Sequence, residues 1–154
     1  MPSLIRKNLT ITIDGNTATL DEPLYIYQGD RNIDVYFAIV DSKFKFSENR
    51  GNILADSTAK YSTIKIMKPN GVKLLTEKQE ITEDNQIIFT INSEFADEAT
   101  EIGTYKLQIQ LWSSEDTNQG RVTIPHVEFE VLEAIFEDGL EEGIITLSYK
   151  RDGE

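Results

Sequence analysis

The sequence predicts an all-β protein built as an antiparallel β-sandwich. Apolar residues alternate with polar ones in five separate runs, turn-forming residues separate these runs, and a single short segment has the features of a helix. A strand sends successive side chains to opposite faces of its sheet, so each alternating run has one buried and one solvated face. Such one-sided burial is typical of antiparallel sheets, because parallel strands covered on both faces form continuous apolar runs.

The five alternating runs are expected to form the central strands. Their apolar side chains take every second position, as a half-buried strand requires, at 33–39, 64–66, 87–91, 105–111 and 127–131. Weaker strands are expected at 9–13 and 24–28, where Asp14-Gly15 and Gly29-Asp30 mark the turns that follow. The stretch 41–60 is long for a hairpin loop, so it is either a decorated loop or a small extra hairpin.

Local turn and capping signals complete the expected fold. Pro69-Asn70-Gly71 separates two β-rich segments, and Asn-Gly accepts the positive φ that a tight hairpin turn needs. Ser93 is a capping residue followed by acids, which predicts one short helix at 93–99. Seven to nine strands with turns at this spacing predict an immunoglobulin-like sandwich.

The chain of 154 residues is expected to divide into a sandwich domain, 1–133, and a carboxyl-terminal extension, 134–154. The extension is acidic, yet it is too apolar for a simple disordered tail. Its apolar residues are candidates for a partner interface, because they are at risk of exposure in a charged segment: Ile135, Phe136, Leu140, Ile144 and Ile145. They either pack on a partner or a neighbouring copy, or form an extra strand of the same domain.

The composition excludes several classes of protein. Fifteen bases against 27 acids give a net charge of -12, which repels phosphate backbones and anionic lipid, so no nucleic-acid or membrane partner is expected. The chain has no Cys and one His, so disulfides, thiolate metal sites and histidine clusters are excluded. No apolar run approaches the ~20 residues of a membrane span, and the amino terminus has no signal-peptide core.

No motif predicts catalysis, a metal or a cofactor. His126 follows Pro125 without a recognised catalytic partner nearby in sequence, and we interpret it as a solvated strand residue. The acidic segments 14–16 and 137–142 have oxygen ligands for a hard cation, but neither fits the twelve-residue calcium loop. A glycosidase pair cannot be selected among so many acids. We therefore expect a protein that is not an enzyme and holds no cofactor or metal.

Trp112 provides the alternative function, a carbohydrate-binding module of a virion or cell-surface protein. It ends a predicted strand in the outward phase, and with Tyr36 or Tyr25 it would form an aromatic platform on which a sugar stacks. Large aromatic residues are mostly buried, however. The favoured interpretation places Trp112 under the carboxyl-terminal extension or under the 41–60 stretch.

The order of several motifs resembles a known family. An early Tyr27-Gln28-Gly29-Asp30 precedes an alternating strand, and the hairpin strand Ile64-Lys65-Ile66-Met67-Lys68 leads into Pro-Asn-Gly. After the short helix come Gly103-Thr104-Tyr105, then Arg121-Val122-Thr123-Ile124-Pro125 and a last strand that ends at Glu133. This order, over about residues 5 to 133, resembles the amino-terminal domain of siphophage baseplate upper proteins from phages and prophages of Gram-positive bacteria.

The resemblance implies a β-sandwich that docks a larger assembly onto the phage tail. It implies a structural tail or baseplate component that attaches a receptor-binding assembly to the tail tip. Its partners would be other baseplate proteins and further copies of itself, and its location the virion, after synthesis in the host cytoplasm. The family offers no catalytic residues. Only 21 residues follow Glu133, so we expect either a piece of a longer protein or a short form that acts only as an adaptor.

Overall fold

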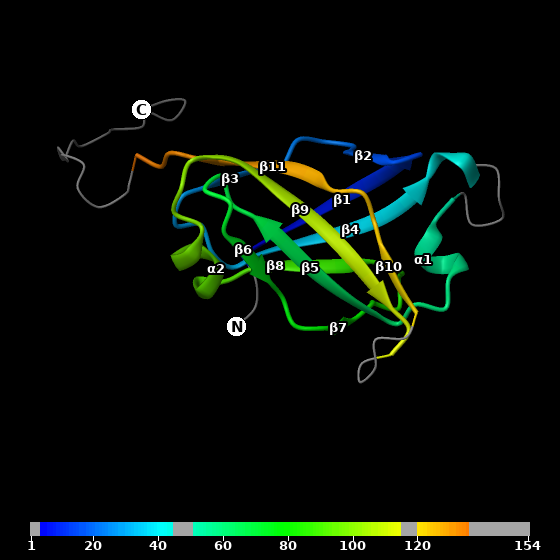
Figure 1. Cartoon of the computed structure of the whole chain (residues 1–154). Coiled ribbons are helices and arrows are strands. Elements are labelled where there is room, and N and C mark those ends of the chain that lie inside the picture. The colour runs from blue at the N-terminus through cyan, green and yellow to red at the C-terminus, as the bar shows by residue number, and fades with distance from the viewer. Residues whose placement is uncertain (1–3, 45–50, 115–119, 136–154) are drawn as a thin grey trace, which may run out of the picture.

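Two β-sheets pack face to face in the computed structural model of the chain, which describes residues 4–44, 51–114 and 120–135 (Figure 1). The first sheet, sheet A, has four strands in the order β2-β1-β4-β8. These strands are β1 (Ile5–Asp14), β2 (Thr17–Leu20), β4 (Ile33–Asp41) and β8 (Ile87–Ile91).

The second sheet, sheet B, is arranged around its longest strand, β9 (Gly103–Trp112). Its main path is β3-β11-β9-β5-β6, in which β10 also pairs with β9 and β7 with β5. The remaining strands are β3 (Tyr25–Tyr27), β5 (Tyr61–Met67), β6 (Lys73–Leu75), β7 (Gln79–Glu80), β10 (Arg121–Thr123) and β11 (Val127–Leu132). All five alternating runs thus lie in β4, β5, β8, β9 and β11, which confirms the β-sandwich.

The sheets are mixed, whereas the sequence analysis expected antiparallel strands. β1 pairs with β4 in parallel over nine residues, from Ile5↔Ile33 to Ile13↔Asp41, and β3 pairs with β11 in parallel. Between β1 and β4 the chain passes through β2 and β3, and this long connection permits a parallel pair. The described residues form eleven strands, more than the seven to nine expected, because β2, β7 and β10 have only two to four residues each and are too short to show a clear alternation.

Two short α-helices lie at opposite ends of the sandwich (Figure 1). The expected helix is confirmed as α2 (Ser93–Glu98), but its N-cap is Asn92, whose side chain accepts a hydrogen bond from the Phe95 N–H at 2.9 Å. The described part of the 41–60 stretch holds a 3₁₀ turn, η1 (Ser42–Phe44), and α1 (Ile53–Asp56). Leu54 on α1 is buried and extends the core, so this part is a decorated loop.

The core consists of the inward-facing side chains of both sheets. Alternation correctly assigned these residues, since Phe37 of β4 and Ile109 of β9 are almost completely buried. An aromatic cluster fills the end beside α2, where Phe89 meets Phe95 edge to face at 5.3 Å and Tyr105 lies 5.3 Å from Phe129. Truncating one of these rings to alanine would cost about 3–5 kcal/mol, as in other close-packed cores.

The Asn70-Gly71 hairpin is fixed to the start of β9. Gly71 has φ of +88° in the turn, as the dipeptide predicted. Lys68 Nζ lies 3.0 Å from Glu101 Oε2, and Asn70 Nδ2 donates to Glu101 Oε1 at 2.8 Å. Gly103 has φ of +137°, and a Cβ there would lie 3.3 Å from Pro69 Cγ, so only glycine suits this approach.

The contacts between the hairpin and β9 shift the pKa values of Tyr105 and Glu101. The Tyr105 hydroxyl donates to the Glu101 carbonyl at 2.7 Å, and burial, with the nearby Glu101 charge, raises the pKa of Tyr105 to about 12. The hydrogen bond from Lys68 is the main cause that lowers the pKa of the Glu101 carboxyl. Glu101 therefore favours the folded state at neutral pH and loses this contribution as the pH falls through its lowered pKa.

The raised pKa of Tyr105 predicts a loss of stability in alkali. An unfolded tyrosine ionises near pH 10, so the contribution of Tyr105 is complete below pH 10 and is lost as the pH rises to about 12. Tyr105→Phe removes the hydrogen bond and should cost about 1 kcal/mol at pH 8. Urea unfolding at pH 8 to 12 should show this difference shrinking as the pH rises. A difference that stays constant would contradict the assignment.

Candidate functional site

The predicted interface residues follow β11. Ile135 is 76% exposed, and it lies beyond the last strand of sheet B. Phe136, Leu140, Ile144 and Ile145 lie outside the described residues, as does the acidic segment 137–142. Ile135 is thus exposed to solvent, and a partner interface at these five residues stays a prediction.

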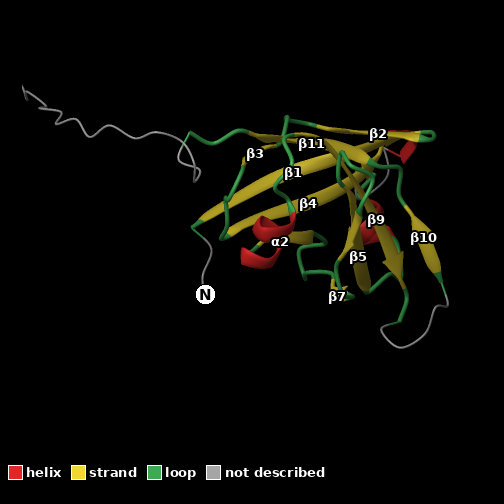
Figure 2. Ribbon diagram, turned by 60° about the vertical axis from the view of Figure 1, so that its left-hand side comes forward, coloured by secondary structure: helices red, strands yellow, loops and turns green. Residues whose placement is uncertain are grey.

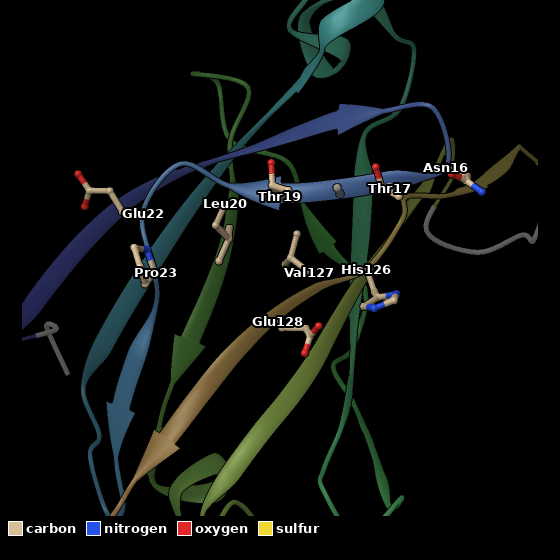
Figure 3. A pocket seen from close by; sticks show the side chains of 10 residues that line it. Asn16, Thr17, Thr19, Leu20, Glu22, Pro23, His126, Val127 and Glu128 are labelled. Carbon is tan, nitrogen blue, oxygen red and sulfur yellow. The ribbon is translucent and has the colours of Figure 1, made fainter.

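A groove of about 430 Å³ opens along the seam between the two sheets (Figure 3). Its floor is apolar and includes Leu20 of β2 and the buried Val127 of β11. Glu22, His126 and Glu128 also line it and supply polar groups. His126 is exposed as expected, but it lies in the connection between β10 and β11 and not within a strand.

Both walls of this seam groove are strand edges. The Asp21 N–H donates to the Thr10 carbonyl at 3.0 Å, and the Thr10 N–H donates to Asp21 Oδ1 at 2.8 Å. Because the backbone groups of a strand point to alternate sides, those of Ala18 and Leu20 on β2 point away from β1. The Glu130 N–H donates to the Leu24 carbonyl rather than to β9, so the backbone of Glu128 has the same outward orientation. Such edges can accept an extended segment of another chain.

The edge at β3 is capped by side chains instead. The Tyr27 N–H donates to Asp30 Oδ2 at 3.0 Å, and Lys7 Nζ donates to the Tyr25 carbonyl at 3.5 Å. Side chains that occupy backbone groups in this way make a strand edge a poor template for pairing. The two edges of the seam therefore differ from β3 in their capacity to bind a strand.

Trp112 lies on the outer face of sheet B under a cation. The residue is 7% exposed, Lys78 Nζ lies 3.9 Å from the ring centroid and Arg121 Cζ lies 5.7 Å from it. The indole Nε1 donates to Thr63 Oγ1 at 3.0 Å. Lys78 comes from the segment between β6 and β7, so within the described residues this segment, and not the 41–60 stretch, provides the cover.

The three aromatic residues of the sugar-platform alternative are not brought together. Trp112 is buried on sheet B, whereas Tyr36 belongs to β4 of sheet A, where Arg6 Cζ stacks 3.7 Å from its ring centroid. Tyr25 is half exposed on β3 at the opposite edge of sheet B from β6. Stacking on a sugar needs an accessible aromatic face, and these positions share no surface.

Among residues 4–44, 51–114 and 120–135, no group of three or more His, Asp or Glu side chains could hold a metal ion. No helix in the described part of the chain is both long and apolar enough to cross a membrane. Asp14 and Gly15 form the β1–β2 turn, where Gly15 has φ of +64° and the Asp14 carbonyl accepts from Thr17 Oγ1.

Removing the cover over Trp112 should change its environment. Lys78→Ala takes away both the stem and the charge above the ring, and the cation–π contact between Lys78 and Trp112 contributes about 0.5–1 kcal/mol. We expect a red-shifted emission and stronger acrylamide quenching of Trp112. Lys78→Met keeps the stem and should quench like the wild type, and Lys73→Ala serves as a remote control. Unchanged quenching in Lys78→Ala would show that another group covers the ring.

Comparison with known proteins shows a likeness in structure but none in sequence. No family model matches the sequence, and no curated protein matches it. Among solved structures, the chain is similar to the N-terminal domain of phage TP901-1 ORF48, with 7% sequence identity and a TM-score of 0.49, over 84% of this chain and 98% of that one.

Proposed function

We propose that this protein is a structural component of a phage tail tip, which docks or adapts a receptor-binding assembly to the tail. The observation that carries the proposal is the order of motifs between Tyr27 and Glu133, which resembles the baseplate family. These motifs fall at structurally related points of one sandwich. Glu101 connects the hairpin turn to the start of β9, because its carboxylate accepts a hydrogen bond from Asn70 and its carbonyl accepts one from the Tyr105 hydroxyl.

The surface of the sandwich supports a role in assembly. Apolar side chains are exposed at its ends and edges, among them Leu4, Ile102, Val122 and Ile135. The seam groove adds two strand edges that can accept a partner segment. Rigid sheets that expose apolar residues at their ends suit a protein held between neighbours in a larger particle.

This role gives the protein a location and a set of partners. It would be made in the bacterial cytoplasm and built into the virion, where other baseplate proteins and further copies of the chain contact it. It would hold no cofactor and catalyse no reaction.

A particle experiment tests this proposal. Phage particles should be purified from a bacterium that carries the coding frame, and their proteins should be identified by mass spectrometry and located by immunogold electron microscopy. We expect the protein at the tail tip. Particles with a disrupted frame should package DNA but lose adsorption to host cells. Complete, infective particles without the protein would contradict the proposal.

The five apolar residues of the extension provide a second test. Replacing Ile135, Phe136, Leu140, Ile144 and Ile145 with serine should reduce the mass of assemblies in light scattering and leave the melting temperature unchanged. If these residues formed an extra strand, each buried side chain would contribute about 1.5–3 kcal/mol. A much lower melting temperature with an unchanged mass would therefore contradict their role at an interface.

A further inference from the structure

The outer face of sheet B carries three exposed lysines around two apolar side chains. Met67 of β5 lies between Lys106 of β9 and Lys73 of β6, and in the next row Lys65 lies beside Leu75. Because Ile64 and Ile66 point into the core, alternation places Lys65 and Met67 on the outside. We call these five residues the lysine face: Lys65, Met67, Lys73, Leu75 and Lys106.

The lysine face differs in charge from the chain as a whole. The chain has a net charge of -12, yet the two rows of the lysine face hold three lysines and no acid. Neighbouring strands are about 4.8 Å apart, so these cations lie close together. Across from Lys106 on the other side, β11 supplies Glu128, which ends the basic area at that strand.

Leu75 adds an apolar contact point to this basic area. Its side chain is 64% exposed, and its cross-strand neighbour is Lys65. A groove of about 530 Å³ runs beside it, where Lys65 and Lys78 supply two cations and Glu77 the single acid of the lining. An exposed apolar side chain with a cationic rim fits a ligand that carries both carboxylates and an apolar group.

Residues 136–142 of this chain have the complementary composition. The segment reads Phe-Glu-Asp-Gly-Leu-Glu-Glu, with four carboxylates and two large apolar side chains in seven residues. It follows directly on Ile135, which is 76% exposed. The described part of the chain therefore ends in a solvent-exposed residue.

We propose that residues 136–142 of one copy bind the lysine face of a second copy. The inference rests on the proposed function, for which it names the self-association contact. Carboxylates of the segment pair with Lys65, Lys73 and Lys106, while Phe136 and Leu140 cover Leu75 and Met67. The contact joins two different surfaces, so it is heterologous and can propagate into a ring.

Such a contact allows an acidic protein to associate with itself. Copies with a charge of -12 repel one another at long range, and a local basic surface is needed to offset that repulsion. Because the contact pairs exposed charges, added salt should weaken it. Electrostatic complementarity also fixes which surface meets which.

Zero-length cross-linking identifies the contact directly. Full-length protein labelled with ¹⁵N is mixed with an equal amount of unlabelled protein, treated with a carbodiimide and analysed by mass spectrometry. We expect peptides that join the three lysines of the lysine face to Glu137, Asp138, Glu141 or Glu142, with one labelled and one unlabelled partner. Cross-links within one isotope only would place the segment on its own sandwich and overturn the proposal, and so would the absence of cross-links to these lysines.

A charge exchange in the full chain provides the matched variants. Lys65→Glu, Lys73→Glu and Lys106→Glu together reverse the lysine face, and changing the four acids of 136–142 to lysine reverses the segment. Either reversal should weaken association by about tenfold or more, and both reversals in one chain should restore it. Lys60→Glu, an exposed change before β5, should have little effect. Failure of the combined variant to associate, with its melting curve intact, would overturn the proposal.

These results are separable from the test of the proposed function. A virion protein located at the tail tip, with no cross-links between its acidic segment and the lysine face, would contradict the inference alone. Cross-links of the expected kind in a protein absent from particles would contradict the proposed function alone.

Discussion

The register of β9 determines most of the structure. β9 pairs with β5 from Met67↔Lys106 to Tyr61↔Trp112, and with β11 and β10 along its other edge. Both ends of β9 are fixed by single side chains: Tyr105 donates to the Glu101 carbonyl, and the Trp112 indole donates to Thr63 on β5. A shift of one residue would turn the inward side chains of β9 to solvent, so these two hydrogen bonds help to select one register.

The same register builds the outer surface of sheet B. With Tyr105 and Ile109 directed inward, Lys106 and Gln110 are directed outward, and they meet Met67 and Thr63 of β5. The basic area at one end and the covered Trp112 at the other are therefore two results of one pairing. Core packing and surface chemistry are coupled in a sandwich, because every strand contributes to both faces.

Periodicity predicted the strands that are long and buried on one face. Phe37, Phe89 and Ile109 were assigned to the core by alternation, and all three are nearly inaccessible to solvent. Strand direction was not predictable, because the period of two is the same for the parallel pair β1–β4 as for an antiparallel pair. The lysine face was missed for a related reason. Lys65 and Lys106 are 41 positions apart in the sequence, and the three lysines become neighbours only through strand pairing.

The distribution of charge explains why a surface contact of this kind would be directional. A symmetric contact between two acidic surfaces would place like charges opposite each other, which costs several kcal/mol in protein interfaces. Contact between the lysine face and an acidic segment avoids this cost, and since each copy carries one of each, every copy has one donor and one acceptor surface. Ordered rings need that polarity. The capped β3 edge, with its Asp30 and Lys7 contacts, blocks a competing edge-to-edge association that would disturb the order.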